Sequence, residues 1–251
     1  MIGTNVLTAG ALAVVGLFIG SFLGSLVLRL PDNRPIVAAR STCPLCRRRL
    51  TPIELVPLLS WAVQGGRCLG CQQRISTFYP AMEIGAAIVA IWASTAMSGV
   101  PLLFSCLLGW LLLALAVMDA RVYRLSDALT LPMLVLGILA AAFMDWHDVL
   151  DHALGAIAGF GVLFLLARLY QAFRGRPGLG LGDAKLFGAG GAWIGWQGLA
   201  PSAVVAGTSA IVAVLAARAL GRHIDATTKI PFGAFLAIGI WIVWLYAPFG
   251  R

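Results

Sequence analysis

Long apolar runs alternate with short polar segments along this chain, and the runs have the length of membrane-spanning helices. The first covers about residues 6–28, and a polar segment then separates it from seven more. These lie at about 81–98, 101–118, 128–144, 152–170, 184–197, 200–219 and 231–248. About 20 apolar residues cross a bilayer as one helix, and two of the runs are short for that. The pattern predicts an all-α polytopic membrane protein with about eight transmembrane helices.

The composition agrees with this pattern and excludes a water-soluble globular protein. Of the 251 residues, 60% are apolar and only 11% are charged, whereas a soluble domain has about 25% charged residues. About 150 apolar residues are enough for seven or eight spans.

Positive charge predicts the orientation of the chain. The first run has no Lys or Arg before it and is followed by Arg29, so it differs from a signal peptide and is interpreted as a retained helix. If every run crosses the membrane, four polar segments share one side. They cover residues 31–79, 119–127, 171–183 and 219–230. Of the 18 Lys and Arg residues, all but Arg251 lie in these segments or in the bordering helix ends, which makes that side cytoplasmic and puts both termini outside.

The net charge of +8 has a competing interpretation, which is affinity for nucleic acid. The positive charge is spread over four segments, as membrane insertion requires, so we expect no nucleic-acid partner.

Four cysteines lie in the longest polar segment, residues 31–79, which we call the cysteine segment. They form two Cys-x-x-Cys pairs, Cys43 with Cys46 and Cys68 with Cys71, separated by 21 residues. This spacing is typical of a tetrahedral four-thiolate zinc site. Two disulfides or four unconnected thiols are the alternatives, and a reducing cytosol disfavours disulfides. We expect a closed, structural zinc site that stabilises a small segment.

These features divide the chain into three parts. Residues 1–30 are the first transmembrane helix, residues 31–79 the cytoplasmic zinc-binding segment, and residues 80–251 a seven-helix membrane domain. Tryptophans near the span ends, such as Trp193 and Trp196, are interpreted as interfacial anchors or lipid-facing bulk.

Three aspartates border the spans at the predicted cytoplasmic face, and ionisable groups there are functional candidates. Asp119 ends the third span, Asp127 opens the fourth, and Asp183 opens the sixth. Capping of a helix N-terminus is the favoured interpretation of Asp127, and for Asp183 it has about the same weight as a functional role. Asp119 ends a helix, where the helix dipole disfavours an anion. Two neighbouring carboxylates share a proton and can hydrolyse a peptide bond, so we hypothesise an aspartyl dyad of Asp119 and Asp183.

Neighbouring residues are candidates for supporting roles. Gly180 and Gly182 precede Asp183 and allow the backbone to approach a partner closely. Lys185 could stabilise the ionised form of Asp183 or extend to lipid headgroups. Asp127 supplies a further carboxylate at the same face.

At this point the chain resembles the bacterial prepilin peptidases, also called type IV leader peptidases, over nearly its whole length. The motifs occur in the family's order. They are Gly20-Ser21-Phe22-Leu23, Arg29-Leu30-Pro31, the cysteine pairs, Pro57-Leu58-Leu59-Ser60-Trp61, Tyr79-Pro80 with Glu83, Asp119, Leu129-Thr130-Leu131-Pro132, Gly180-Leu181-Gly182-Asp183-Ala184-Lys185, Gly191-Ala192-Trp193-Ile194-Gly195 and Pro231-Phe232-Gly233.

The resemblance implies an aspartyl membrane protease of the Gly-x-Gly-Asp group in the bacterial inner membrane, with its active site facing the cytoplasm. Such enzymes remove the basic leader of type IV prepilins and type II secretion pseudopilins. Many members then methylate the new N-terminus with S-adenosylmethionine. Carried over, the catalytic pair is Asp119 and Asp183, which favours catalysis over capping for Asp183, and the zinc ligands are the four paired cysteines. Spacing does not locate the methyl-donor site, so Glu54 and Glu83 are no more than candidates for it, and a buried helix–helix contact is an equal alternative for Glu83. The implied partners are prepilin or pseudopilin substrates and membrane lipid.

Two departures from the family pattern are visible. Ser126 stands where members commonly have Pro before the aspartate, and Arg176-Pro177-Gly178 stands where they often have Glu-Gly. Both catalytic positions are present, and loss of the acid could alter recognition of a basic leader.

Other classes remain as alternatives. A transporter would place carboxylates near the middle of the bilayer and repeat its halves. A non-enzymatic zinc-ribbon adaptor would explain the cysteines but not Asp119 beside the Gly-x-Gly-Asp run. Within the protease interpretation, the presenilin-like and archaeal preflagellin enzymes are the nearest alternatives, and the cysteine segment favours the bacterial form.

Overall fold

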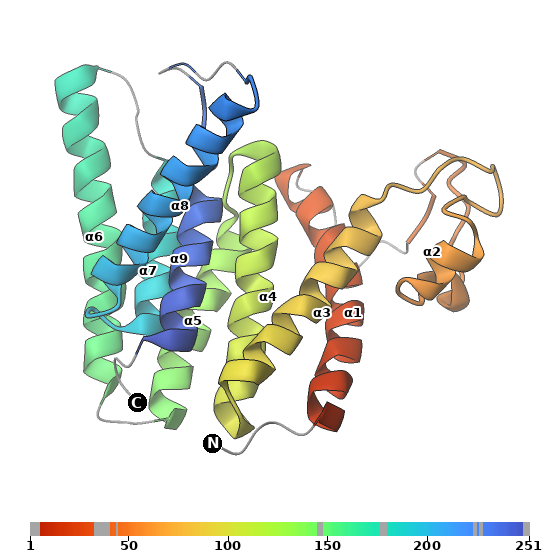
Figure 1. The fold of residues 1–251 in the computed structure, drawn as a ribbon, viewed down its shortest axis with the longest axis horizontal. Helices are drawn as coiled ribbons and strands as arrows, with labels where there is room; N and C mark the ends of the chain where they lie inside the picture. Colours follow the sequence, from red (N-terminus) through yellow and green to blue (C-terminus); the bar gives the residue numbers. More distant parts are fainter. Residues whose placement is uncertain are drawn as a thin grey trace. The chain divides into compact units, whose positions relative to one another are not determined.

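The computed structural model describes residues 6–32, 41–43, 45–144, 148–175, 180–222, 225 and 228–247. Helices form the regular structure of these residues, and isolated antiparallel bridges join Thr42 to Arg49 and Arg67 to Arg74. The helices (Figure 1) are α1 Val6–Arg29, η1 Leu30–Asp32, η2 Pro52–Leu55, α2 Leu59–Val63, α3 Phe78–Ala96, α4 Gly99–Val122, α5 Asp127–Met144, α6 Val149–Arg174, α7 Leu181–Ile194, α8 Leu199–Ala219 and α9 Phe232–Tyr246. The predicted all-α class is confirmed.

Each predicted apolar run corresponds to one helix. Six of these helices, α1, α3, α4, α5, α6 and α8, are long and apolar enough to cross a membrane. The other two are shorter, with 14 residues in α7 and 15 in α9. At 1.5 Å per residue they span only about 21–23 Å, less than the hydrocarbon core of about 30 Å. Six candidate spans are therefore established among the described residues, and a total of eight stays a prediction.

The chain forms two compact units, and the division between Ala114 and Leu115 falls inside α4. In the first unit α1 packs along α3, and two glycines bring the backbones close. A Cβ atom on Gly16 would lie 2.7 Å from the carbonyl oxygen of Ala86, and one on Gly20 would lie 2.6 Å from the Cα of Glu83. Side chains at either position would force these helices apart.

In the second unit α7 packs against α5, α6 and α9, and Figure 1 shows it among them. Nearly all of α7 after Lys185 is buried. Trp193 is 1% exposed, and its indole N–H donates to the Met133 carbonyl at 2.7 Å. The interpretation of Trp193 as an anchor or lipid-facing residue is wrong because α7 is a central helix. Trp196, just beyond α7, is exposed.

Close contact between α6 and α7 gives a stability prediction. A Cβ atom on Gly155 would lie 2.6 Å from the backbone carbon of Gly195, whereas one on Gly161, also in α6, would meet open space. We expect Gly155→Val to lower the free energy of unfolding by about 3 kcal/mol, as overpacking does, and Gly161→Val to change it far less. Unfolding in mixed micelles, followed by tryptophan fluorescence, measures both. Equal stability of the two variants would contradict this packing.

Candidate active site and metal centre

The three predicted aspartates lie at helix ends in the second unit. Asp119 is in the last turn of α4, Asp127 is the first residue of α5, and Asp183 is in the first turn of α7. The N-terminus of α9 joins them, because the backbone N–H of Ala234 donates to the carboxylate of Asp119. The fold therefore collects four helix ends around the predicted site.

Asp119 is 5% exposed, and its Oδ2 atom lies 3.1 Å from the backbone nitrogen of Ala234. Its position near the C-terminus of α4 is unfavourable for an anion, but the first turn of α9 offers backbone N–H groups and the positive end of a dipole. Gly233 makes this contact possible, since a Cβ atom there would lie 2.9 Å from Oδ2. Asp119 therefore also holds the start of α9 in place.

Asp183 is partly buried within the first turn of α7, and the N-cap position is occupied by Gly180, without a side-chain capping bond. The structure thus does not support Asp183 as the N-cap. Its carboxylate interacts electrostatically with that of Asp119. The structure brings this predicted pair to the same end of the second unit.

Leu125, in the connection between α4 and α5, packs between the two aspartate-bearing regions. A Cβ atom on Gly182 would lie 3.1 Å from the Cβ of Leu125, and one on Gly233 would lie 3.0 Å from its Cδ1. Gly182, beside Asp183, and Gly233, beside Asp119, are therefore both neighbours of one leucine. The absence of a side chain at each glycine is required by this packing.

Asp127 and Lys185 form an ion pair between α5 and α7. The Lys185 ammonium donates to both carboxylate oxygens of Asp127, at 2.7 and 2.8 Å. The hydroxyl of Ser126 accepts the N–H of Ala128 at 3.3 Å, so Ser126 rather than Asp127 supplies the cap of α5. The capping interpretation of Asp127 is wrong because its carboxylate is bound by Lys185, two residues beyond Asp183.

The four paired cysteines meet in the first unit, with all four sulfur atoms within 4.8 Å of one another. Two of the separations are 3.8 Å, from Cys43 to Cys71, and 4.0 Å, from Cys46 to Cys68. Four thiolates at about 2.3 Å from a tetrahedral zinc ion are separated by about 3.8 Å. The cysteines are not joined by disulfides. The cluster therefore has the donor set and the dimensions of a zinc site.

Backbone groups favour the thiolate, the form that binds metal, at Cys68 and Cys43, whereas burial and the neighbouring cysteine side chains raise the pKa of Cys46 to about 11. The backbone N–H groups of Cys71 and Gly70 lower the pKa of the Cys68 thiol to about 6. Those of Cys46 and Leu45 lower the pKa of Cys43 in the same way.

Glu54 and Glu83, the candidates for a methyl-donor site, both have structural partners. Glu54 accepts from the Arg48 guanidinium and from the backbone N–H of Thr51 at 2.9 Å. The Thr51 N–H and hydroxyl, together with Arg48, hold the pKa of the Glu54 carboxyl below its ordinary value. Glu83 is 5% exposed in α3 and accepts the N–H of Leu58 at 2.8 Å. These contacts account for both carboxylates without a ligand.

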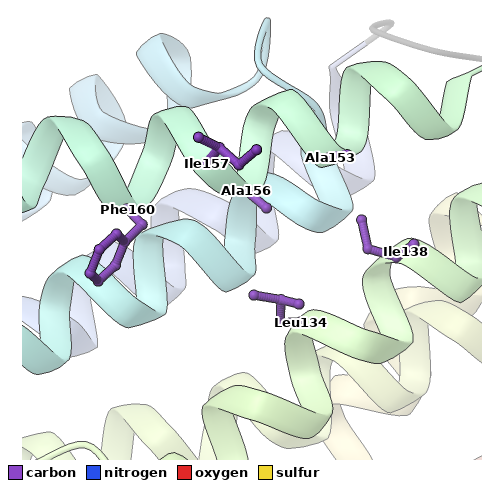
Figure 2. Close-up of a pocket in the computed structure, with 6 residues that line it drawn as sticks. All are labelled: Leu134, Ile138, Ala153, Ala156, Ile157 and Phe160. Carbon is purple, nitrogen blue, oxygen red and sulfur yellow. The ribbon is translucent and has the colours of Figure 1, made fainter.

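An apolar cavity of about 430 Å³ lies between α5 and α6, and Figure 2 shows its lining side chains. They are Leu134, Ile138, Ala153, Ala156, Ile157 and Phe160. The polar side chains that hydrolysis or metal binding requires are missing from this lining, so the cavity is not a candidate for the chemistry.

Sequence reasoning missed three neighbours of the aspartates: Leu125, Gly233 and the backbone of Ala234. The Pro231-Phe232-Gly233 motif marked this segment in the sequence, but spacing alone could not indicate that it would contact Asp119 at the end of α4.

Comparison with known proteins gives two family matches along the chain. Residues 14–97 match the bacterial peptidase A24 N-terminal domain, and residues 106–221 match the type IV leader peptidase family. The first match contains the four paired cysteines and the second contains Asp119 and Asp183.

Individual relatives match over most of the chain. A protein of Aeromonas salmonicida named prepilin leader peptidase/N-methyltransferase is 35% identical over 92% of this chain and 88% of its own length. Proteins of the same name from Aeromonas hydrophila and Pseudomonas aeruginosa are 36% and 33% identical, over 92% and 93% of this chain and 88% of their own lengths. No solved structure matches the chain.

The ion pair between α5 and α7 leads to a prediction about the first turn of α7. We expect Lys185→Met to speed hydrogen exchange of the amides at 183–187 by about two- to fivefold, the range of an exposed ion pair. Combining Asp127→Lys with Lys185→Asp should restore slow exchange. Lys229→Met, which removes an exposed lysine outside the helices, is the control. Unchanged exchange in the single Lys185 variant would show that the pair does not hold this turn.

Proposed function

Because the chain belongs to the type IV leader peptidase family, we propose that it is an aspartic endopeptidase that cleaves the leader from type IV prepilins or type II secretion pseudopilins. Asp119 and Asp183 are the catalytic pair. The observation that carries this proposal is that Asp119 and Asp183, from α4 and α7, lie at the same end of the second unit, beside glycines that pack on Leu125, within the matched family region.

The proposed hydrolysis divides two roles between the carboxylates, because two neighbouring acids ionise one at a time. The ionised member accepts a proton from water while the water oxygen bonds to the scissile carbonyl carbon. The protonated member donates to the peptide nitrogen as the carbon–nitrogen bond breaks. The products are a leader with a new carboxylate and a mature protein with a new N-terminal amine. The N–H of Ala234 orients Asp119 during these transfers.

The enzyme is a multi-pass protein of the bacterial inner membrane, and its active site faces the cytoplasm. The distribution of arginine and lysine supports this orientation. The substrate places its apolar helix beside the spans and its basic leader at the cytoplasmic face. No nucleic acid takes part.

Zinc is the structural metal of the cysteine segment, residues 31–79. Cys43, Cys46, Cys68 and Cys71 would hold the ion, whose chemistry there is to cross-link the segment. Residues 1–30 provide the first transmembrane helix, and residues 80–251 provide the seven-helix protease domain. The four-thiolate donor set supports this assignment.

The second activity is N-methylation of the new N-terminus, as the name of the relatives indicates for them. S-adenosylmethionine would supply the methyl group to the amine nitrogen and would leave as S-adenosylhomocysteine with release of a proton. No residue is assigned to the methyl donor, because Glu54 and Glu83 are bound by their own neighbours.

One assay tests both reactions and the catalytic pair. Purified enzyme is incubated with a prepilin and labelled S-adenosylmethionine, and the N-terminal mass of the product is measured. We expect cleavage followed by addition of one methyl group, and a loss of cleavage by a factor of about 10² to 10⁴ in Asp119→Asn and in Asp183→Asn. Asn keeps an acceptor for Ala234, so the fold should persist. Asp225→Asn, outside the helices, is the control. Normal cleavage by either catalytic variant would refute the dyad.

The zinc assignment predicts one zinc ion per chain, measured by elemental analysis of purified protein. Cys68→Ser should lose the metal and expose residues 41–77 to proteolysis, because the ion holds both turns. Cys106→Ser, a change of the one cysteine in α4, should retain it. Metal-free protein with unchanged protease resistance would rule out a structural zinc.

A further inference from the structure

The cysteine segment exposes large apolar side chains, which is unusual for a small domain surrounded by water. Val63 in α2 is 86% exposed and Ile53 in η2 is 80% exposed. Other large apolar side chains of the segment are also exposed. They are Leu45, Leu55, Leu59 and Leu69. An exposed apolar surface of this kind indicates contact with an apolar partner, such as a membrane.

The segment is fixed beside a membrane helix at a defined depth. Leu58, which precedes α2, donates its N–H to Glu83, and Glu83 lies five residues after the start of α3 at Phe78. Five residues of helix correspond to about 8 Å along the axis, and α3 is a candidate span. The start of α2 is thus level with the second turn of α3. A bilayer boundary at the start of α3 would put α2 about 8 Å into it, and interfacial helices lie at about 5–10 Å into the boundary between headgroups and acyl chains.

Trp61 of α2 packs against the residues that flank the second cysteine pair, Cys68 and Cys71. A Cβ atom on Gly66 would lie 3.0 Å from the indole ring of Trp61, and the indole N–H donates to the Ile75 carbonyl at 3.5 Å. Residues 66 and 75 are also joined by a backbone bond from the Ile75 N–H to the Gly66 carbonyl, at 2.7 Å. The apolar helix and the residues between 66 and 75 therefore form one body.

Two arginines face each other in that body. Arg67 and Arg74 are paired across the antiparallel bridge, and both are exposed. Residues directly opposite on one face have Cβ atoms about 4.5–5.5 Å apart, where like charges repel. A phosphate group between two guanidinium groups would turn this repulsion into charge-assisted hydrogen bonds. From residue 41 to residue 77 the one acid is Glu54, which Arg48 already binds.

We propose that the cysteine segment docks onto an anionic lipid leaflet, with Leu59 and Val63 of α2 among the acyl chains and a lipid phosphate bound between Arg67 and Arg74. Apolar side chains at interfacial depth beside a paired positive site match a phospholipid, whose phosphate and acyl chains occupy those two levels. This inference concerns how the segment is held on the membrane and does not depend on the leader peptidase activity.

Hydrogen exchange of the full-length protein in nanodiscs tests the docking. We expect the amides of residues 59–76 to exchange on the order of tenfold more slowly when about a third of the lipid is phosphatidylglycerol than in phosphatidylcholine alone. Arg67→Gln combined with Arg74→Gln should abolish this difference. Leu59→Ser combined with Val63→Ser should speed exchange in both lipids. Arg47→Gln combined with Arg49→Gln removes the same charge without touching the facing pair and should keep the difference.

Zinc content, measured on every variant, verifies that the segment is folded. Equal exchange of the unmodified protein in the two lipids would overturn the proposal. Inorganic phosphate added to the protein in neutral micelles is a second test. If it slows exchange of residues 59–76 as much as phosphatidylglycerol does, a free anion accounts for the arginine pair and the proposal is overturned. A benzophenone amino acid at position 63 should form a lipid adduct on illumination, whereas one at the exposed Gln73 should form far less. Equal adduct yields at the two positions would contradict the insertion of α2.

Discussion

The second unit depends on one hydrogen-bonded contact, between the carboxylate of Asp119 and the N-terminus of α9. A buried acid in the last turn of a helix is unfavourable by itself. Here the backbone N–H of Ala234 compensates it, and this N–H is shared between the acid and the Pro231 carbonyl at the start of α9. The contact requires glycine at 233 because a Cβ atom would reach the carboxylate. A group proposed for catalysis thus also holds two helices together.

The position of Asp183, like that of Asp119, depends on close packing around glycine residues. Asp183 begins a helix whose later residues are buried among α5, α6 and α9. Leu125 packs against the glycines beside both acids, and Lys185 joins α7 to Asp127. Packing, more than the flexibility of a glycine-rich loop, therefore explains why small residues surround this site. The cysteine segment is built differently, since thiolates and backbone N–H groups organise it in place of a core.

Much of this architecture could be predicted from the sequence, because length and hydrophobicity decide whether a helix suits a membrane. All eight apolar runs became helices, and the four cysteine sulfurs met as their spacing suggested. Asp119 and Asp183 lie at the same end of the second unit, and their role as a dyad stays a prediction. Contacts between distant segments could not be predicted. Asp127 resembled a cap because it begins α5, yet its partner Lys185 is far along the chain. Trp193 resembled an interfacial residue because it ends a run, but α7 is central and buries it.

The shortness of α7 has a consequence for the supply of water. Its 14 residues measure about 21 Å, so a helix of this length leaves roughly 9 Å of a hydrocarbon core without its backbone. Because α7 is buried among α5, α6 and α9, protein and not lipid surrounds this deficit, and polar groups at the helix end can border a space that water fills. Asp183 lies at one of these ends. Hydrolysis consumes a water molecule at every turnover, and a truncated helix lets that reactant reach Asp183 without a separate channel.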